Sequence, residues 1–183
     1  WANDNRTVFY IKNDPVTLLG DRVYRHLVGQ NPQNDTLAYQ EDDKTYYMGI
    51  GKTKSGKYII IGQQSTLSND YHILDANEPD GEFKRFTKRL KKHRYSIDHI
   101  GEEFIIKTDA QSKNRSIMRT HETRTDKKNW KDLIPPRKTI FVRDFDAFNN
   151  HLVLTEKKKD KVSLRVIDRR TMGSHYISFD ERA

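Results

Sequence analysis

Short apolar runs recur along the whole chain, and in many of them apolar and polar side chains alternate. Gly, Asn, Asp and Lys bound these runs. Alternation with a period of two is typical of strands with one buried face, whereas the 3.6-residue period of an amphipathic helix is scarce in this sequence. The pattern therefore predicts an all-β protein built from many short strands.

The predicted strands repeat at a nearly constant spacing. The runs KYIII, EEFII and NHLVL begin at residues 57, 102 and 150, which is 45 and 48 residues apart (102 − 57 and 150 − 102). Three other predicted strands repeat at a similar spacing, and a partial copy of the repeat unit lies upstream. These runs are YYMGI (46–50), YSIDHI (95–100) and TIFVRDF (139–145); DYHIL (70–74), RSIMR (115–119) and SLRVI (163–167); EFKRF (82–86), WKDLI (130–134) and HYISF (175–179); and upstream TVFYI (7–11), RVYRHL (22–27) and TLAYQ (36–40).

Four short strands in each unit of about 40 to 50 residues are typical of the blades of a β-propeller. We expect a partial β-propeller, all-β, with three to four blades of four-stranded antiparallel sheet at about 1–41, 45–88, 94–135 and 138–180. The first blade is expected to lack nearly all of its innermost strand, because the sequence starts at Trp1. A ring typically has about 4 to 8 blades, each packed on its neighbours, so the end blades should expose apolar surface and favour self-association or aggregation.

The stretch GKTKSGKYIII (51–61) resembles the phosphate loop of a nucleotide hydrolase in its two glycines and Lys57. That loop requires a Ser or Thr after the lysine, to reach Mg²⁺, and a helix that starts there. Tyr58 occupies the hydroxyl position, and the aromatic and β-branched residues that follow favour a strand. We therefore interpret the stretch as a hairpin, with Ser55 and Gly56 in the turn.

The segment FKRFTKRLKKHR (83–94) fits two structures. Phe83, Phe86 and Leu90 have helical spacing, so a short helix competes with the outer strand that the repeat predicts. The repeat favours the strand over the first half. The second half, KRLKKHR (88–94), is expected to be an exposed connector.

Composition and charge argue against several classes of protein, including disordered, membrane-spanning and disulfide-linked proteins. Nine Tyr and eight Phe argue against disorder although 33% of residues are charged, and there is no apolar run long enough to span a bilayer. The first residues lack the features of a signal peptide, and the absence of cysteine excludes disulfides and thiolate sites and agrees with a reducing compartment. The net charge of +8 falls in basic runs that are mixed with Asp and Glu in predicted turns, so solvated loops are favoured over a nucleic-acid surface.

No motif points to a catalytic or metal-binding residue in this chain. G-x-S-x-G and H-E-x-x-H are both absent, and DANEPDGE (75–82) lacks the glycine and the oxygen ligand that a calcium loop requires. Asp144 and Asp146 are two residues apart on a predicted strand and are interpreted as surface carboxylates. We therefore expect no catalytic, cofactor-binding or metal-binding residues and no cofactor.

With the blade order established, four stretches resemble the propeller of the oligopeptidase B (protease II) branch of the prolyl oligopeptidase family of serine peptidases. They are TVFYIKNDPVTLLGDRVYRHLVG (7–29), DYHILDANEPDGEFKRF (70–86), MRTHETRTDKKNWKDLIPPR (118–137) and SHYISFDE (174–181). The resemblance implies a cytoplasmic peptidase that cleaves short peptides after Lys or Arg. It also implies a Ser-Asp-His triad in a C-terminal α/β-hydrolase domain that this sequence does not contain, with the propeller limiting access to the active site.

The resemblance implies the catalytic domain and short basic peptides as partners, with no nucleic acid and no membrane. Cationic peptides need acidic subsites. These lie either in the catalytic domain or along a path lined by Glu102, Glu103, Asp144 and Asp146, and the sequence does not distinguish the two. A stand-alone propeller interaction module and a basic nucleic-acid-binding protein are the alternatives, although the WD-repeat and Kelch motifs are absent.

Overall fold

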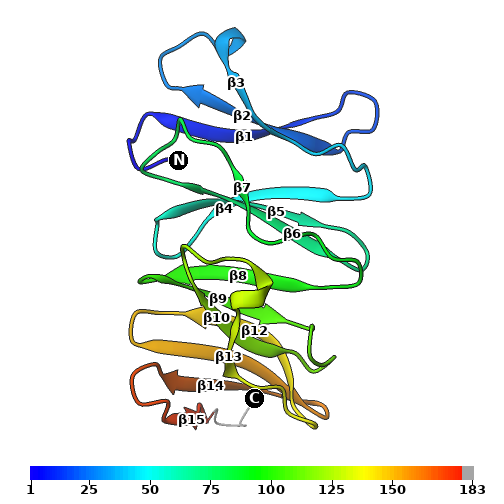
Figure 1. Cartoon of the computed structure of the whole chain (residues 1–183), viewed down its shortest axis with the longest axis vertical. Coiled ribbons are helices and arrows are strands. Elements are labelled where there is room, and N and C mark those ends of the chain that lie inside the picture. Colours follow the sequence, from blue (N-terminus) through cyan, green and yellow to red (C-terminus); the bar gives the residue numbers. More distant parts are fainter. Residues whose placement is uncertain (179–183) are drawn as a thin grey trace. The chain divides into compact units, whose positions relative to one another are not determined.

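The computed structural model describes residues 1–178 as a series of short strands (Figure 1). The strands are β1 (Thr7–Asn13), β2 (Gly20–Leu27), β3 (Thr36–Gln40), β4 (Tyr47–Lys52), β5 (Tyr58–Gln64), β6 (Asn69–Asp75), β7 (Lys84–Arg85), β8 (Tyr95–Ile100), β9 (Glu103–Thr108), β10 (Ser116–His121), β11 (Lys131–Ile134), β12 (Phe141–Ala147), β13 (His151–Lys158), β14 (Lys161–Asp168) and β15 (Ser174–Tyr176). Two 3₁₀ turns, η1 (Pro32–Asn34) and η2 (Lys127–Asn129), are the helical segments of residues 1–178.

The strands form four antiparallel sheets, each from strands that are consecutive in the chain. We call these sheets blade 1 (β1 to β3), blade 2 (β4 to β7), blade 3 (β8 to β11) and blade 4 (β12 to β15). Blade 1 has three strands and the others have four. The predicted all-β, partial propeller is thus confirmed. The final residues of the run HYISF (175–179), of the stretch SHYISFDE (174–181) and of the predicted fourth blade (138–180) lie outside the described residues.

The chain divides into two compact units, Trp1–His93 with blades 1 and 2, and a second unit that starts at Arg94 and holds blades 3 and 4. In each unit one hydrophobic cluster joins the facing sides of the two blades. The cluster in the first unit contains Phe9 and Val23 from blade 1 and Ile59, Ile61 and Leu74 from blade 2. The cluster in the second unit contains Ile100, Ile105, Ile117 and Ile134 from blade 3 and Val142, Ala147, Leu152, Leu154 and Ile167 from blade 4. Face-to-face burial of the sheets therefore supplies the core of both units.

The repeat alignment is wrong by one residue in the third strand of blade 3. In blade 2, Gln63 pairs with Asp70, and at the equivalent position of blade 3 Thr108 pairs with Ser116. The third strands are thus offset by 46 residues (116 − 70) rather than 45, because the loop before β10 is one residue longer. Since side chains alternate along a strand, this shift moves every side chain of RSIMR (115–119) to the face opposite the one that the alignment predicts.

The stretch 51–61 forms the hairpin between β4 and β5, as predicted, and no helix follows it. Gly56 has a φ of +71°, in the left-handed region that glycine adopts at low cost, and its N–H donates to the carbonyl of Thr53 at 2.8 Å. The equivalent turn of blade 4 contains Asn149 and Asn150, and neither has a positive φ. The asparagine turn of blade 4 therefore does not use the left-handed backbone that Gly56 adopts in blade 2.

The outer strand of blade 2 is confirmed in the segment 83–94, but it has only the two residues of β7. The prediction that 88–94 is an exposed connector is wrong in part. His93 is buried, and the Arg89 side chain is only 21% exposed because it reaches back to carboxylates of both blades of its unit. Within residues 1–178 there is no helix long and apolar enough to cross a membrane.

The outer face of blade 4 carries a patch of partly exposed aliphatic residues. Val153 pairs with Val166 across β13 and β14, and both point away from Leu152, Leu154 and the rest of the buried cluster, because side chains alternate between the faces. Val162 and Leu164 continue the same face, and Val162 is 43% exposed. We call Val153, Val162, Leu164 and Val166 the open face of blade 4.

Candidate functional site

A buried polar cluster joins blade 1 to blade 2 within the first unit. We define the Arg89 clasp as Glu41, Gln63, Asp70 and Arg89. Gln63 and Asp70 are 1% and 0% exposed, respectively, and Glu41 is 8% exposed. Buried charges are tolerated only when they are paired and hydrogen-bonded, so the partners of each group determine what the cluster does.

The clasp is assembled from four separate segments. Glu41 follows β3 of blade 1, Gln63 lies near the end of β5, Asp70 lies near the start of β6, and Arg89 lies in the loop after β7. These points meet because antiparallel neighbours bring the end of one strand beside the start of the next. Tyr39, in β3, completes the shell by accepting a hydrogen bond from the Gln63 amide at 3.1 Å.

Arg89 connects the acidic groups of the clasp. Its Nε donates to the Asp70 carboxylate at 2.9 Å, and its Nη2 donates to the Glu41 carboxylate and, at 3.2 Å, to the side-chain carbonyl of Gln63. The guanidinium also lies 4.0 Å from the centre of the Tyr46 ring. Burial raises the pKa of Glu41, but the hydrogen bonds from Arg89 and from the N–H of Asp43 outweigh it, and the pKa lies below the ordinary value. The carboxylate is therefore ionised at neutral pH, and the cluster acts as an inter-blade ion pair.

His72 lies beside the clasp and is 4% exposed. Its ring centre is 4.5 Å from that of Tyr39, and its Nδ1 has no hydrogen-bond partner among the described residues. Burial lowers the pKa of His72 from 6.5 to about 4; Asp70 and Glu41 act in the opposite direction, and the charges of Arg85 and Arg89 lower it further. The ring is thus neutral at pH 7.

We expect acid to destabilise the fold through His72. Its pKa is lower in the folded state than in the unfolded state, so the unfolded chain binds more protons as the pH falls from 6.5 to about 4. The free energy of unfolding should fall by about 3 kcal/mol over that range. Urea titrations at several pH values, compared with the non-titrating variant His72→Gln, would measure this difference. Superimposable pH profiles of the two proteins would exclude it.

Blade 4 has a second buried polar cluster at the equivalent place. Glu156 is 2% exposed. Its carboxylate accepts hydrogen bonds from Arg137, which precedes β12, and from the Tyr176 hydroxyl at 2.9 Å, and Arg165 lies 3.9 Å away. As in the first unit, a residue of the connection between two blades is paired with a buried polar residue of the second strand.

The sequence analysis did not identify either cluster, although a signal was present. Gln63, Thr108 and Glu156 are spaced by 45 and 48 residues, like the second strands themselves, and all three are buried. Two residues beyond each aligned run, the repeat therefore changes from apolar to polar. An alignment longer by two positions would have shown a polar residue at the same point of the second strand in three blades, and so would have indicated a buried polar side chain there.

The four carboxylates considered for an acidic path lie on two elements: Asp144 and Asp146 in β12, Glu103 at the start of β9 and Glu102 just before it. Asp144 is 2.7 Å from the Lys107 ammonium, near the end of β9, and this pair holds the pKa of Asp144 below its ordinary value although burial acts in the opposite direction. Glu102 and Glu103 lie at the other end of β9. Glu102 is exposed and lies 3.9 Å from His121.

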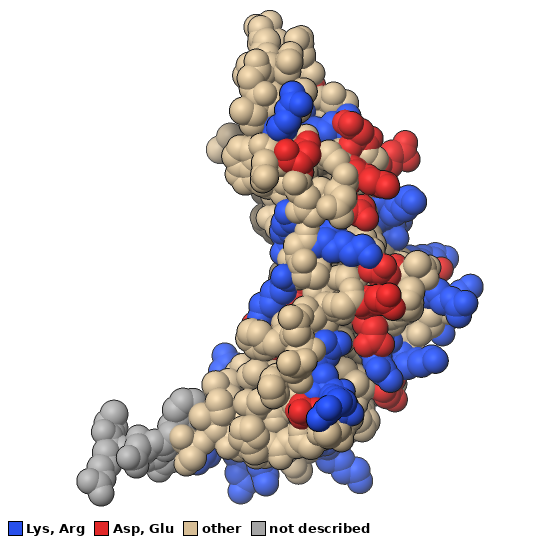
Figure 2. Space-filling view, turned by 90° about the vertical axis from the view of Figure 1, so that its left-hand side faces the viewer, with Lys and Arg blue, Asp and Glu red and all other residues tan. Residues whose placement is uncertain are grey.

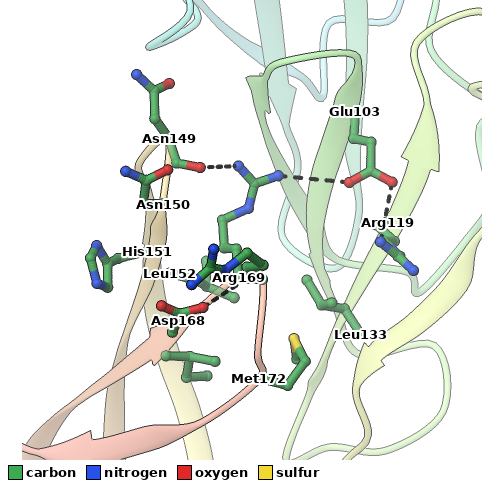
Figure 3. A pocket seen from close by; sticks show the side chains of 12 residues that line it. Glu103, Arg119, Leu133, Asn149, Asn150, His151, Leu152, Asp168, Arg169 and Met172 are labelled. Carbon is green, nitrogen blue, oxygen red and sulfur yellow. Dashed lines mark hydrogen bonds and ion pairs between the residues drawn. The ribbon is translucent and has the colours of Figure 1, made fainter.

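Glu103 lies in a groove of about 560 Å³ between blades 3 and 4 (Figure 3). Its carboxylate is shared by Arg119 at 3.4 Å and by Arg169 at 3.7 Å. Arg169 also donates to the backbone carbonyl of Asn149 at 2.9 Å, so it spans the groove from one wall to the other. Glu103 is therefore neutralised by cations of this chain.

Charged side chains of both signs are mixed over the face shown in Figure 2. Among the described residues, no group of three or more His, Asp or Glu is placed to hold a metal ion. The geometry shows sheets that are joined in pairs by their apolar faces, and in the first unit also by a buried ion pair. These features define a propeller module whose blades are packed in pairs.

Comparison with known proteins gives the family. The family model of the N-terminal β-propeller domain of prolyl oligopeptidase matches residues 1–182. The chain therefore belongs to the prolyl oligopeptidase family and corresponds to part of its propeller domain. Dipeptidyl aminopeptidase BI of Pseudoxanthomonas mexicana is 36% identical over 184 residues, which cover 100% of this chain and 25% of that protein. Protease 2 of Moraxella lacunata is 26% identical over 98 residues, 54% of this chain and 14% of that protein.

Solved structures agree on the fold. Oligopeptidase B from Leishmania major superposes with a TM-score of 0.88 at 20% identity, and covers 100% of this chain and 27% of that one. Oligopeptidase B from Trypanosoma brucei, with covalently bound antipain in a closed form, gives 0.87 at 23% identity, with the same coverage. The chain thus spans about a quarter of the length of these proteins. The identification of the family from the sequence is confirmed.

Proposed function

We propose that this chain is the non-catalytic propeller portion of a serine oligopeptidase that cleaves short peptides after Lys or Arg. The match of residues 1–182 to the propeller domain of the family is the observation that carries the proposal. In this proposal the partner is a C-terminal α/β-hydrolase domain of the same, longer, cytoplasmic protein. The chain alone is inactive.

The role we propose for the propeller is to restrict access to that catalytic domain. A cover of this kind must keep its shape while it moves as a body. The two hydrophobic clusters and the buried ion pair of Arg89 with Glu41 support this role, because each connects two sheets. Folded proteins would be excluded by size, and short peptides admitted.

We further propose that the acidic subsites for cationic substrates lie outside residues 1–178. The two best-placed carboxylates of the path considered above are already neutralised. Glu103 is shared by two arginines, and Asp144 is paired with Lys107. Neither is available as an unpaired acid for a lysine or arginine of a substrate.

A second candidate activity follows from the relative with 36% identity, whose name describes the removal of dipeptides from an amino terminus. The parent protein would then act on Xaa-Arg and Xaa-Lys sequences only where the amino terminus is unblocked. This specificity would still require the same propeller and catalytic domain. The two candidates differ in the substrate that they reject.

Fluorogenic dipeptides separate these activities. The parent protein should release the fluorophore from both the free and the N-blocked form of an Xaa-Arg substrate if it is an oligopeptidase, but only from the free form if it is a dipeptidyl aminopeptidase. Residues 1–183 alone should release none, and an Xaa-Glu substrate should be resistant. Equal cleavage of Xaa-Glu and Xaa-Arg by the parent would refute the preference for basic residues, and activity of residues 1–183 alone would refute the non-catalytic role.

A further inference from the structure

Arg119, in the groove between blades 3 and 4, has an equivalent residue in the first unit, and the contacts of that residue indicate what Arg119 can bind. Arg119 pairs with Ile105 across β9 and β10, and Arg25 pairs with Phe9 across β1 and β2. Ile105 and Phe9 both belong to the hydrophobic cluster of their unit. Arg25 and Arg119 therefore occupy the same position in their blades and point toward the next blade of their own unit.

In the first unit, this arginine is bound by an acidic turn. Arg25 donates to the backbone carbonyl of Pro79 at 2.7 Å, and its guanidinium lies 3.2 Å from the carboxylate of Asp80. Both acceptors belong to the connection between β6 and β7 of blade 2. The Arg25 side chain is 21% exposed as a result.

In the second unit, the corresponding turn is too short to do the same. Residues 169–173 join β14 to β15, whereas residues 76–83 join β6 to β7. The shorter turn contains no Asp or Glu. Arg119 remains 47% exposed, and its ion pair with Glu103 is 3.4 Å long, beyond the roughly 2.7–2.9 Å of a strong charge-assisted hydrogen bond.

The groove has a surplus of positive charge over the acids that line it. Arg119, Arg169 and Arg170 line it, with Glu103 and Asp168 as the acids. Asp168 is committed to its own turn, because its carboxylate accepts the N–H groups of Arg170 and Thr171 at 2.9 and 2.8 Å. Glu103 is thus the one acid of this lining that faces the arginines, and two guanidinium groups share it.

We propose that the groove between blades 3 and 4 is a docking site for an acidic turn of a partner protein segment. The partner presents an Asp or Glu carboxylate next to an accessible backbone carbonyl, and Arg119 binds both, as Arg25 binds Asp80 and Pro79. Charge complementarity and the internal precedent of the first unit select this occupant. Glu103 competes with the incoming carboxylate and sets the affinity.

The chain's own turn supplies the probe. The peptide acetyl-Asn-Glu-Pro-Asp-Gly-Glu-amide copies residues 77–82. A second peptide has Asn in place of its Asp and retains both glutamates. Isothermal titration of residues 1–183 should show binding of the first peptide that is about tenfold tighter than that of the second, since the loss of a charge-assisted hydrogen bond has an effect of this order.

Variants of the chain locate the site. Arg119→Ala should weaken binding about tenfold, and Arg119→Lys should recover only part of the loss because it lacks the planar pair of donors. Arg143→Ala, an exposed arginine of β12, is the matched control and should leave binding unchanged. Glu103→Gln should strengthen binding several-fold, since it removes the competing carboxylate; a purely structural role of Glu103 predicts weaker binding instead. Circular dichroism should show equal melting of all variants.

Three results would overturn the proposal. They are the absence of peptide binding, equal affinity for the Asp and Asn peptides, and undiminished binding by a folded Arg119→Ala protein. Displacement of the peptide by sulfate at the same concentration would also overturn it, because the groove would then be a general anion site without preference for a turn.

Discussion

Replacing Arg89 with Met is expected to lower the free energy of unfolding by about 3–5 kcal/mol, the usual cost of removing one partner of a buried ion pair. The substitution keeps much of the aliphatic volume but removes the cation that lies between the buried carboxylates of Glu41 and Asp70. Asp70 retains its ion pair with Arg85 at 3.3 Å, so the larger loss falls on Glu41. Gln63 would also lose its contact with the guanidinium. Urea unfolding followed by circular dichroism measures the effect.

Two comparisons make the Arg89 prediction specific. Lys88→Met changes the neighbouring, exposed cation and should alter stability by less than about 0.5 kcal/mol. Adding Glu41→Gln and Asp70→Asn to Arg89→Met should recover part of the loss, because neutral groups cost less to bury than carboxylates that have lost the Arg89 cation. If Arg89→Met were as stable as Lys88→Met, the Arg89 clasp would contribute nothing to the free energy of unfolding, and the prediction would be wrong.

Residues 1–183 alone are expected to self-associate through the open face of blade 4. Val153, Val162, Leu164 and Val166 form an aliphatic patch that no described residue covers fully, and such patches favour association. In a propeller, a face of this kind packs on the next blade. Sedimentation velocity should show a weight-average mass that rises with protein concentration.

Charges on the open face should prevent that association. The double variant Val153→Lys and Val166→Lys places two cations on paired positions of the patch, and we expect at least a tenfold weaker association. Both side chains are already partly exposed, so the fold should tolerate lysine there. Val16→Lys, at a site that is 88% exposed in a loop, is the matched control and should associate like the wild type. A wild-type protein that stays monomeric at all concentrations would rule out the association.

The strand positions could be predicted because they depend on local patterning. The second strands of blades 2, 3 and 4 contain apolar residues at a spacing that repeats along the chain, and β5, β9 and β13 lie at those places. The hairpin at Gly56 could be predicted for a similar reason, since the turn and its flanking residues each favour the same structure. The register of β10 could not, because one extra loop residue leaves no mark in the hydrophobic pattern of the strand itself.

The polar clusters required the folded chain. Arg89 belongs to a basic run that looks like a solvated loop, and its two carboxylate partners are 48 and 19 residues away in sequence. Nothing in the run itself distinguishes Arg89 from Lys88 or Lys91. The distinction arises because the loop after β7 passes the end of β3, which places one cation among buried acids and leaves its neighbours in water.

The sequence by itself determined that the chain forms short strands in the repeated groups of a propeller, because period and turn chemistry act over a few residues. The family followed separately, from the resemblance of four stretches of the chain to the prolyl oligopeptidase family. Only the tertiary structure decided which charges are buried and paired, and that Arg119 stays partly exposed with a long ion pair to Glu103. Ion pairing depends on distances of a few ångströms between segments remote in sequence, and the packing of one blade on another sets those distances.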